Sequence, residues 1–348
     1  MKKLRYIIFL VSLIIGINVV SCDKYDTIVV GQAFAPYNSL VTKFRQLVYV
    51  EFRNGDARVW GPCADLVESI IDDSHVTLTS SLDSLVVFAY GYAVNDSVLV
   101  SHGNISINSS QPYALYLKDL VLSSEDGPAI QSVGASDCYL VLPAKTLSKV
   151  YGSLSFGGSL IIDGEGALNV VADDASAISV SRGITCSYPV AVNLTSRTAD
   201  GIQAKQGNIK IADGTWTIAA SRHAFSTSAG QVILNGGKVY ASAETGSIVS
   251  SPEGMGLVAN ATVCVGMSAK KSVVEEVERR QFVWNLQLPD TMSFDADSIV
   301  TILRDPNFSG NPIKLTTFVP AYTFHAPWVL VTDSLLTEAD DIIFETLP

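Results

Sequence analysis

Four residues at nearly equal spacing carry side chains that can bind a polyhydroxylated ligand. They are Asn169, Asn193, Thr217 and Tyr240, which recur at an almost constant interval. Amides and hydroxyls exchange hydrogen bonds with sugar hydroxyls, while an aromatic ring covers the apolar C–H face of a sugar. If each residue lies on one coil of a stacked sheet, the four form a row with steps of about 4.8 Å. We therefore predict a shallow binding row that an extended glycan can follow.

The same row also has a purely structural interpretation. Asparagine ladders are an ordinary device for stabilising stacked strands, so the four side chains can equally belong to the surface of a solenoid. Trp216 offers a ring for stacking on sugar, but period-2 alternation places it on the same face as Ile218. That alternation favours a core position for Trp216.

A second group of chemically capable residues lies in the turns that follow these segments. Its members are Asp173, Asp174, Arg197, Asp200, Arg222 and His223. Acids, arginine and histidine on neighbouring coils are what a polysaccharide lyase or hydrolase would use, one pair to neutralise a uronate and another group to move a proton. A salt-bridged turn is the simpler interpretation, because no fixed motif ties the residues together.

The elements that must position these residues are short repeated strands. One apolar column recurs at Ile130, Ile178, Ile202, Phe225 and Ile248, and a second runs nine or ten positions ahead of it at Leu120, Leu168, Val192, Trp216 and Val239. A repeat of about 23–24 residues without a helical period predicts one supersecondary unit stacked many times. We expect an all-β fold, a right-handed, single-stranded parallel β-helix whose coils hold two or three strands each.

The pattern divides the chain into four expected segments. These are a signal peptide at 1–21, an N-terminal β-rich segment or cap at 22–95, the parallel β-helix at 96–268, and a charged linker with a small β-rich C-terminal cap at 269–348. A terminal cap is expected because the last coil of a solenoid otherwise exposes its core.

The segment 1–21 has the character of an export signal. Lys2, Lys3 and Arg5 precede an apolar run that ends in small residues just before Cys22. This arrangement resembles the lipobox of bacterial lipoproteins, in which Cys22 would become the lipidated first residue. The resemblance implies a protein of the bacterial cell envelope, attached to a membrane through a lipid anchor only, at the outer membrane, surface or periplasmic face.

Charge and cysteine content narrow the choice of partners. The formal net charge is −11, and removal of the three basic residues of 1–21 gives 20 − 34 = −14. An acidic chain argues against nucleic acid, which requires a basic patch. Beyond Cys22, the cysteines Cys63, Cys138, Cys186 and Cys264 have no CxxC spacing and allow three pairings or none.

Three stretches carry a resemblance to a known family. They are GPAI at 127–130, VYGSLSFGGSLIIDGEGALNV at 150–170, and ADGIQAKQGNIKIADGTWTI from Ala199 onward. In this order they resemble the bacterial carbohydrate-binding β-helix proteins, over about residues 96–268 and more weakly over 299–346. Such proteins are exported, often lipidated, and associated with cellulose and pectin-type acidic polysaccharides, with calcium held by aspartates.

The resemblance implies calcium ligands at Asp200 and, two positions out of register, at Asp174. Asp200 precedes Gly-Ile as in the family, whereas counting back from Ile178, Phe225 and Ile248 gives Ser176, His223 and Gly246. Calcium takes six to eight oxygen ligands, so this broken column leaves room for a single calcium site at most.

We expect non-catalytic binding of polysaccharide, of cellulose or pectin type, at the cell envelope. One alternative is a structural or adhesive surface lipoprotein that binds a protein partner. Another is a calcium-dependent polysaccharide lyase built on the turn residues.

Overall fold

The computed structural model describes residues 44–53, 55–94, 97–257, 263–274, 283–294, 299–304, 313–318, 324–332 and 344–347. The expected signal peptide and Cys22 lie outside these residues, as does most of the charged linker. Within the described part of the chain, no helix is long and apolar enough to cross a membrane.

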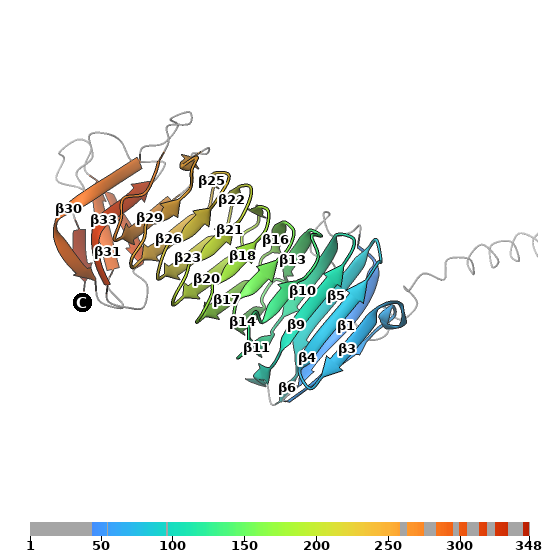
Figure 1. Cartoon of the computed structure of the whole chain (residues 1–348). Coiled ribbons are helices and arrows are strands. Elements are labelled where there is room, and N and C mark those ends of the chain that lie inside the picture. Colours follow the sequence, from blue (N-terminus) through green and yellow to red (C-terminus); the bar gives the residue numbers. More distant parts are fainter. Residues whose placement is uncertain are drawn as a thin grey trace, which may run out of the picture.

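The chain forms a parallel β-helix, as the repeat predicts. A typical coil contains three strands, for example β17 (Ala167–Ala172), β18 (Ile178–Val180) and β19 (Ile184–Cys186). Each strand pairs in parallel with its counterpart one coil later, so the coils build three long sheets. Figure 1 shows the coils stacked along one axis, with the first strands at one end and β30, β31 and β33 at the other.

The three sheets are named here sheet 1, sheet 2 and sheet 3. Sheet 1 contains, in spatial order, β2 (Asp56–Trp60), β1 (Gln46–Arg53), β5 (Leu85–Gly91), β10 (Tyr113–Lys118), β13 (Cys138–Leu142), β16 (Leu160–Gly164), β19, β22 (Ile209–Ile211), β25 (Val232–Leu234) and β28 (Met255–Leu257). Sheet 2 contains β30 (Val283–Phe294), β33 (Phe324–Thr332), β29 (Val263–Ser268), β26 (Lys238–Ala243), β23 (Thr215–Ala220), β20 (Ala191–Ser196), β17, β14 (Leu147–Tyr151), β11 (Val121–Ser123) and β8 (Ser101–His102). Sheet 3 contains β27 (Val249–Ser250), β24 (Phe225–Thr227), β21 (Ile202–Ala204), β18, β15 (Leu154–Phe156), β12 (Ile130–Ser132), β9 (Asn104–Ser109), β4 (His75–Ser80) and β3 (Glu68–Asp72).

The apolar columns of the sequence form the core. Leu168, Val192, Trp216 and Val239 are in one register, and all four are buried. Trp216 is a core residue as alternation predicts, and its Nε1 donates a hydrogen bond to the Asp213 carbonyl oxygen at 3.2 Å. These side chains fill the interior between the sheets, where burial of apolar surface is the main stabilising contribution.

The apolar column that begins at Ile130 differs from the prediction at its last member. Ile130, Leu154, Ile178, Ile202 and Phe225 are in register as expected, but Phe225 pairs with Val249 rather than with Ile248. The last interval of the column is therefore longer than expected by a single position. Both Ile248 and Val249 are buried, so apolarity alone does not identify the paired residue.

Tight turns between the strands depend on particular glycines. Gly164 has φ = 111°, and a Cβ added there would overlap the Leu142 carbonyl oxygen of the preceding coil. Only glycine adopts this backbone conformation without steric cost while the next coil approaches so closely.

The two ends of the solenoid are closed by antiparallel strands. At the N-terminal end, β2 pairs with β1 and β3 pairs with β4, with the short 3₁₀ helix η2 (Ala64–Leu66) between them. A two-stranded sheet of β6 (Ala93–Val94) and β7 (Ser97–Val98) follows β5. Parallel stacking already includes β1 and β5, so coils begin before residue 96.

At the C-terminal end, sheet 2 changes direction. β33 pairs antiparallel with β29, and β30 pairs antiparallel with β33. The remaining strands, β32 (Ile313–Phe318), β31 (Ile299–Arg304) and β34 (Phe344–Leu347), form a separate three-stranded sheet. This region has the β-rich character expected of the C-terminal part.

The cysteines of the solenoid are buried rather than paired with one another. Cys138, Cys186 and Cys264 are free thiols, so none of the three pairings among the four cysteines after Cys22 is formed. Burial raises the pKa of each of these three thiols to about 12.

Candidate functional site

The four predicted binding residues share one row on the outer face of sheet 2. Asn169 on β17 is level with Asn193 on β20, then with Thr217 on β23 and Tyr240 on β26. Asn193 is exposed and the other three are partly exposed, while their neighbours along each strand point inward and are buried. Neighbouring strands lie about 4.8 Å apart, so the row presents one polar or aromatic group per coil.

Two of these residues are bonded to each other. Asn193 Nδ2 donates a hydrogen bond to Asn169 Oδ1 across 2.8 Å. An asparagine side chain has two donor hydrogens and two acceptor lone pairs, so this bond leaves Asn169 Nδ2 and Asn193 Oδ1 able to bind elsewhere. The pair therefore forms a structural ladder and keeps both a donor and an acceptor group on two side chains that reach solvent.

The outer face of sheet 2 differs in charge from the chain as a whole. Across β14, β17, β20, β23 and β26, the outward positions contain no aspartate or glutamate, and their charged residues are Lys149 and Lys238. The complete sequence carries 34 acidic and 23 basic residues. This face is thus suited to neutral ligands and also to ligands that carry carboxylates. An acidic surface would repel the carboxylates.

Two tyrosines, Tyr151 and Tyr240, lie on the outer face of these five strands. The sequence predicts only Tyr240 as a binding residue. Tyr240 is partly exposed, and burial raises the pKa of its phenol, which keeps the hydroxyl protonated. Tyr151, at the end of β14, is 44% exposed and was not among the expected site residues. Its outward position follows from its pairing with Val171 on β17.

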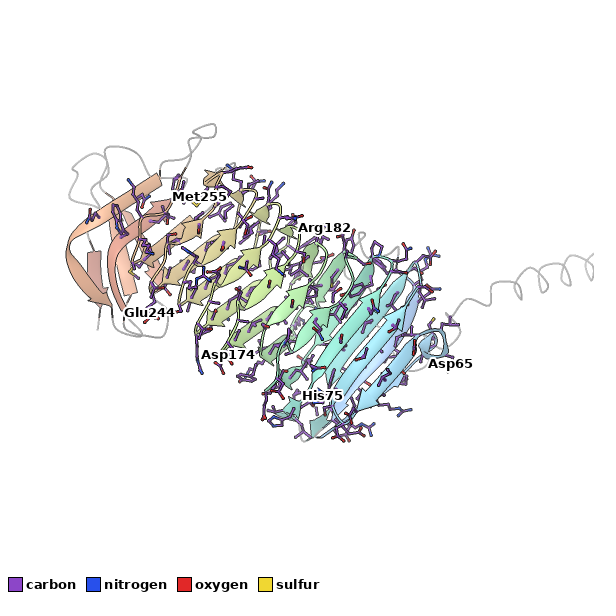
Figure 2. The ribbon with its side chains drawn as sticks, viewed as in Figure 1. Asp65, His75, Asp174, Arg182, Glu244 and Met255 are labelled. Carbon is purple, nitrogen blue, oxygen red and sulfur yellow. The ribbon has the colours of Figure 1, made fainter. Side chains whose placement is uncertain are left out.

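The charged turn residues lie together between sheets 2 and 3, and several form ion pairs. Arg197 Nη1 lies 2.9 Å from Asp173 Oδ1, with both side chains well exposed. Arg222 Nε lies 3.8 Å from the buried Oδ1 of Asp200. Figure 2 shows Asp174 and Glu244 on this edge of the solenoid, directed outward, with Arg182 on the opposite edge. Such pairs are what a salt-bridged turn contains.

A column of polar residues continues inside the same turns. Ser176, Asp200, His223 and Ser247 occupy matching positions two residues before the paired strand residues Ile178, Ile202, Phe225 and Val249. The corrected register thus replaces the expected Gly246 by Ser247. Asp200 Oδ1 accepts a hydrogen bond from the His223 backbone N–H at 3.1 Å, and His223 Nδ1 accepts one from the Ser247 N–H at 3.1 Å.

This column contains an aspartate, a histidine and a serine, but its geometry differs from a catalytic triad. In a triad the acid orients one ring nitrogen and the serine contacts the other. Here His223 Nδ1 faces Ser247, Asp200 contacts the backbone of His223 rather than its ring, and Ser247 Oγ donates to the Val249 carbonyl oxygen at 2.9 Å. Partial burial lowers the pKa of His223, opposed by the nearby Asp200 carboxylate. These contacts stabilise the turn.

The residues expected to bind calcium do not form a multi-carboxylate site. Asp174 is exposed and level with Thr198 of the next coil, while Asp200 is buried and level with Ser176. No group of three or more His, Cys, Asp or Glu residues suited to a metal ion occurs among the described residues. One buried oxygen, Asp200 Oδ2, lacks a hydrogen-bond partner, but a single carboxylate is far from the ligand set that calcium requires.

The fold and the outer face of sheet 2 define a class of protein, a parallel β-helix with a regular row of amide, hydroxyl and aromatic groups. A family model described as "Carbohydrate-binding domain-containing protein" matches residues 72–279, which is more than half of the chain. The chain belongs to this family. The match includes the whole row on sheet 2. No curated protein and no solved structure matches the chain.

Proposed function

We propose that this protein binds polysaccharide of cellulose or pectin type without cleaving it, on the outer face of sheet 2. The observation that carries the proposal is the single register of Asn169, Asn193, Thr217 and Tyr240 on an acid-free face. Family membership supports the carbohydrate as the class of ligand.

Binding on this face takes place through many weak contacts. The free donor of Asn169 and the free acceptor of Asn193 exchange hydrogen bonds with sugar hydroxyls, and Thr217 adds a hydroxyl in the same row. The ring of Tyr240 covers the apolar side of a sugar, while its protonated hydroxyl remains a donor. Each contact is shallow, so affinity comes from the number of coils that a polymer touches.

We place this activity at the bacterial cell envelope, with Cys22 as the site of a lipid anchor. The basic and apolar residues before Cys22 support this assignment. Metabolic labelling of cells with a radioactive fatty acid tests it directly, because Cys22→Ser removes the acceptor thiol. Label that remains on the Cys22→Ser protein would exclude the anchor.

The ligand is tested with the purified protein on insoluble cellulose and on a pectate gel. We expect retention on one of these polymers with no rise in ultraviolet absorbance from unsaturated uronide. The double variant Asn193→Ala/Tyr240→Ala is expected to lose most of this retention. A matched control is Gln203→Ala, which removes an outward amide on sheet 3.

Each outcome distinguishes between functions. Unchanged retention of the double variant refutes the assignment to sheet 2, and absorbance that rises with time establishes a lyase. Failure to bind any polymer favours the structural or adhesive lipoprotein. The binding mechanism proposed here includes no calcium step, so retention is expected to survive an excess of chelator.

A further inference from the structure

We infer that the glycan lies along the axis of the solenoid and spans at least five coils, held at its two ends by Tyr151 and Tyr240. This inference rests on the proposed function of sheet 2 and adds to it a direction, a minimum length and a further binding residue. Tyr151 is a large side chain that is 44% exposed and lies outside the core.

The two tyrosines stand at opposite ends of one face. Tyr151 is on β14 and Tyr240 is on β26, with β17, β20 and β23 between them. Following the register from Tyr151 leads to Ser242, two positions beyond Tyr240 on the same strand. The two tyrosines are four strands apart, at about 4.8 Å per strand, and are offset along the strand by two residues, at about 3.3 Å per residue. Together these displacements separate them by about 20 Å.

Polar groups fill the interval between the rings. Asn169, Asn193 and Thr217 lie one to a coil along it, and no outward acidic residue of these strands interrupts them. On the row of Tyr151, the later positions Ala219 and Ser242 are buried. The row of Tyr240 is accessible on all five coils, beginning with the exposed Lys149 on β14, and Tyr151 lies two positions beyond Lys149 on that strand.

The dimensions of the face favour this direction over a path along the strands. An outward face of three side chains measures only about 13 Å along a strand, and it ends at the ion-paired turn of Arg197 and Asp173. Along the axis the same face repeats coil after coil. Along this direction each coil presents a polar or aromatic side chain to the glycan at a constant spacing.

This arrangement predicts a dependence of affinity on chain length. A short oligosaccharide reaches one ring, whereas one that spans about 20 Å reaches both, and the second contact is then intramolecular. Affinity should thus rise gently with length at first and rise by about tenfold or more once both rings are reached, as expected for linked weak contacts. Loss of either tyrosine should abolish that rise while leaving the weak binding of short chains.

The test is calorimetric titration of the full chain with two unbranched series, cello-oligosaccharides and oligogalacturonides, from disaccharide to octasaccharide. Tyr151→Ala removes one ring, and Tyr151→Phe keeps the ring while removing the hydroxyl. Tyr92→Ala is the matched control, because Tyr92 is also 44% exposed but follows a strand of sheet 1 and packs against Arg53. Circular dichroism and thermal unfolding establish that each variant is folded.

We expect Tyr151→Ala to reduce affinity for the longest oligosaccharides at least tenfold, with Tyr151→Phe and Tyr92→Ala close to the unaltered protein. Affinity that does not depend on length, or that is unchanged in Tyr151→Ala, overturns this inference while the proposed function stands. Absence of binding by either series, together with failure to bind the polymers, overturns both.

Discussion

Asn193 on one coil donates a hydrogen bond to Asn169 on the preceding coil, 2.8 Å away, on the outermost surface of sheet 2. A counterpart exists on sheet 3 between the same two coils, where Ser179 Oγ donates to Gln203 Oε1 at 3.5 Å. The molecule thus contains a surface bond on each of two sheets between the same coils, and one of these bonds lies on the proposed binding row. Removing each hydrogen bond in turn and comparing the variants distinguishes a structural ladder from a ligand contact.

Replacing Asn193 by alanine should reduce polysaccharide retention without a large loss of stability. A hydrogen bond at an exposed position contributes only about 1 kcal/mol to folding, so the free energy of unfolding should fall by no more than this. Ser179→Ala should have a similarly small effect on stability and none on retention. Urea unfolding and polymer pull-down of both variants measure the two effects. Equal loss of retention in both would indicate that coil stability, not the row, governs binding.

Trp216→Ala should destabilise the protein severely. The side chain is fully buried and its Nε1 donates to the Asp213 carbonyl oxygen, and removal of a buried aromatic residue costs about 3–5 kcal/mol. Thr215→Ala, an exposed change on the same strand, is the control and should be nearly neutral. Chemical denaturation followed by fluorescence or circular dichroism gives both values. A stable Trp216→Ala protein that has lost only binding would contradict the core assignment.

Mild acid should weaken the turn that contains His223. Burial lowers its pKa in the folded state, so the unfolded chain binds a proton at a pH where the folded chain does not. The stability contributed by neutral His223 is present above the unfolded pKa of about 6.5 and is lost as the pH falls through the lower folded pKa. A protonated ring would also place an N–H against the Ser247 N–H that now donates to Nδ1.

The pH effect can be isolated with His223→Asn, whose side-chain oxygen can still accept from Ser247 but does not titrate. Unfolding free energies measured from pH 7.5 down to pH 5 should fall less steeply in this variant than in the unaltered protein. His102→Asn, at an exposed position, should retain the original slope. Identical slopes in all three proteins would refute the role assigned to His223.

The thiols of Cys138, Cys186 and Cys264 should resist modification in the folded protein. All three are buried, and burial raises their pKa to about 12. Since the thiolate is the reactive form, a thiol-specific reagent at pH 8 should label them only after denaturant is added. Mass spectrometry after brief labelling identifies the sites. Rapid labelling of any of the three under native conditions would show that its coil opens.

The architecture was predictable because its signals are local and repeated. Between Leu168 and Ala241, alternation within each strand separates buried from outward residues, and the constant period identifies which residues share a row. The expected column failed at its last member, since Ile248 and Val249 are both apolar and the final interval is longer by a single position. The register between two coils depends on the length of the turn that joins their strands. The apolar pattern of the sequence does not indicate that length.

Tyr151 illustrates what the sequence pattern does not report about the site. Lys149 pairs with Asn169, and this interval is shorter than the period of the clear repeats, so the coil of β14 falls out of the alignment. Only the pairing of β14 with β17 in the structure shows which residues of β14 lie level with the predicted binding row. The polar turn column is similar, because hydrogen bonds such as those of Asp200 and His223 depend on backbone groups of the next coil.

The antiparallel pairing of β33 with β29 affects how readily one copy of the protein can associate end to end with another. A bare parallel edge is a template on which another chain can add strands, and a stack of identical coils would otherwise grow into fibres. In sheet 2 the edge groups of β29 are already bonded to β33, and in sheet 1 the Met255 N–H donates to the Val273 carbonyl oxygen. These contacts cover the edges of β29 and β28, which disfavours head-to-tail addition of a second copy through those two strands.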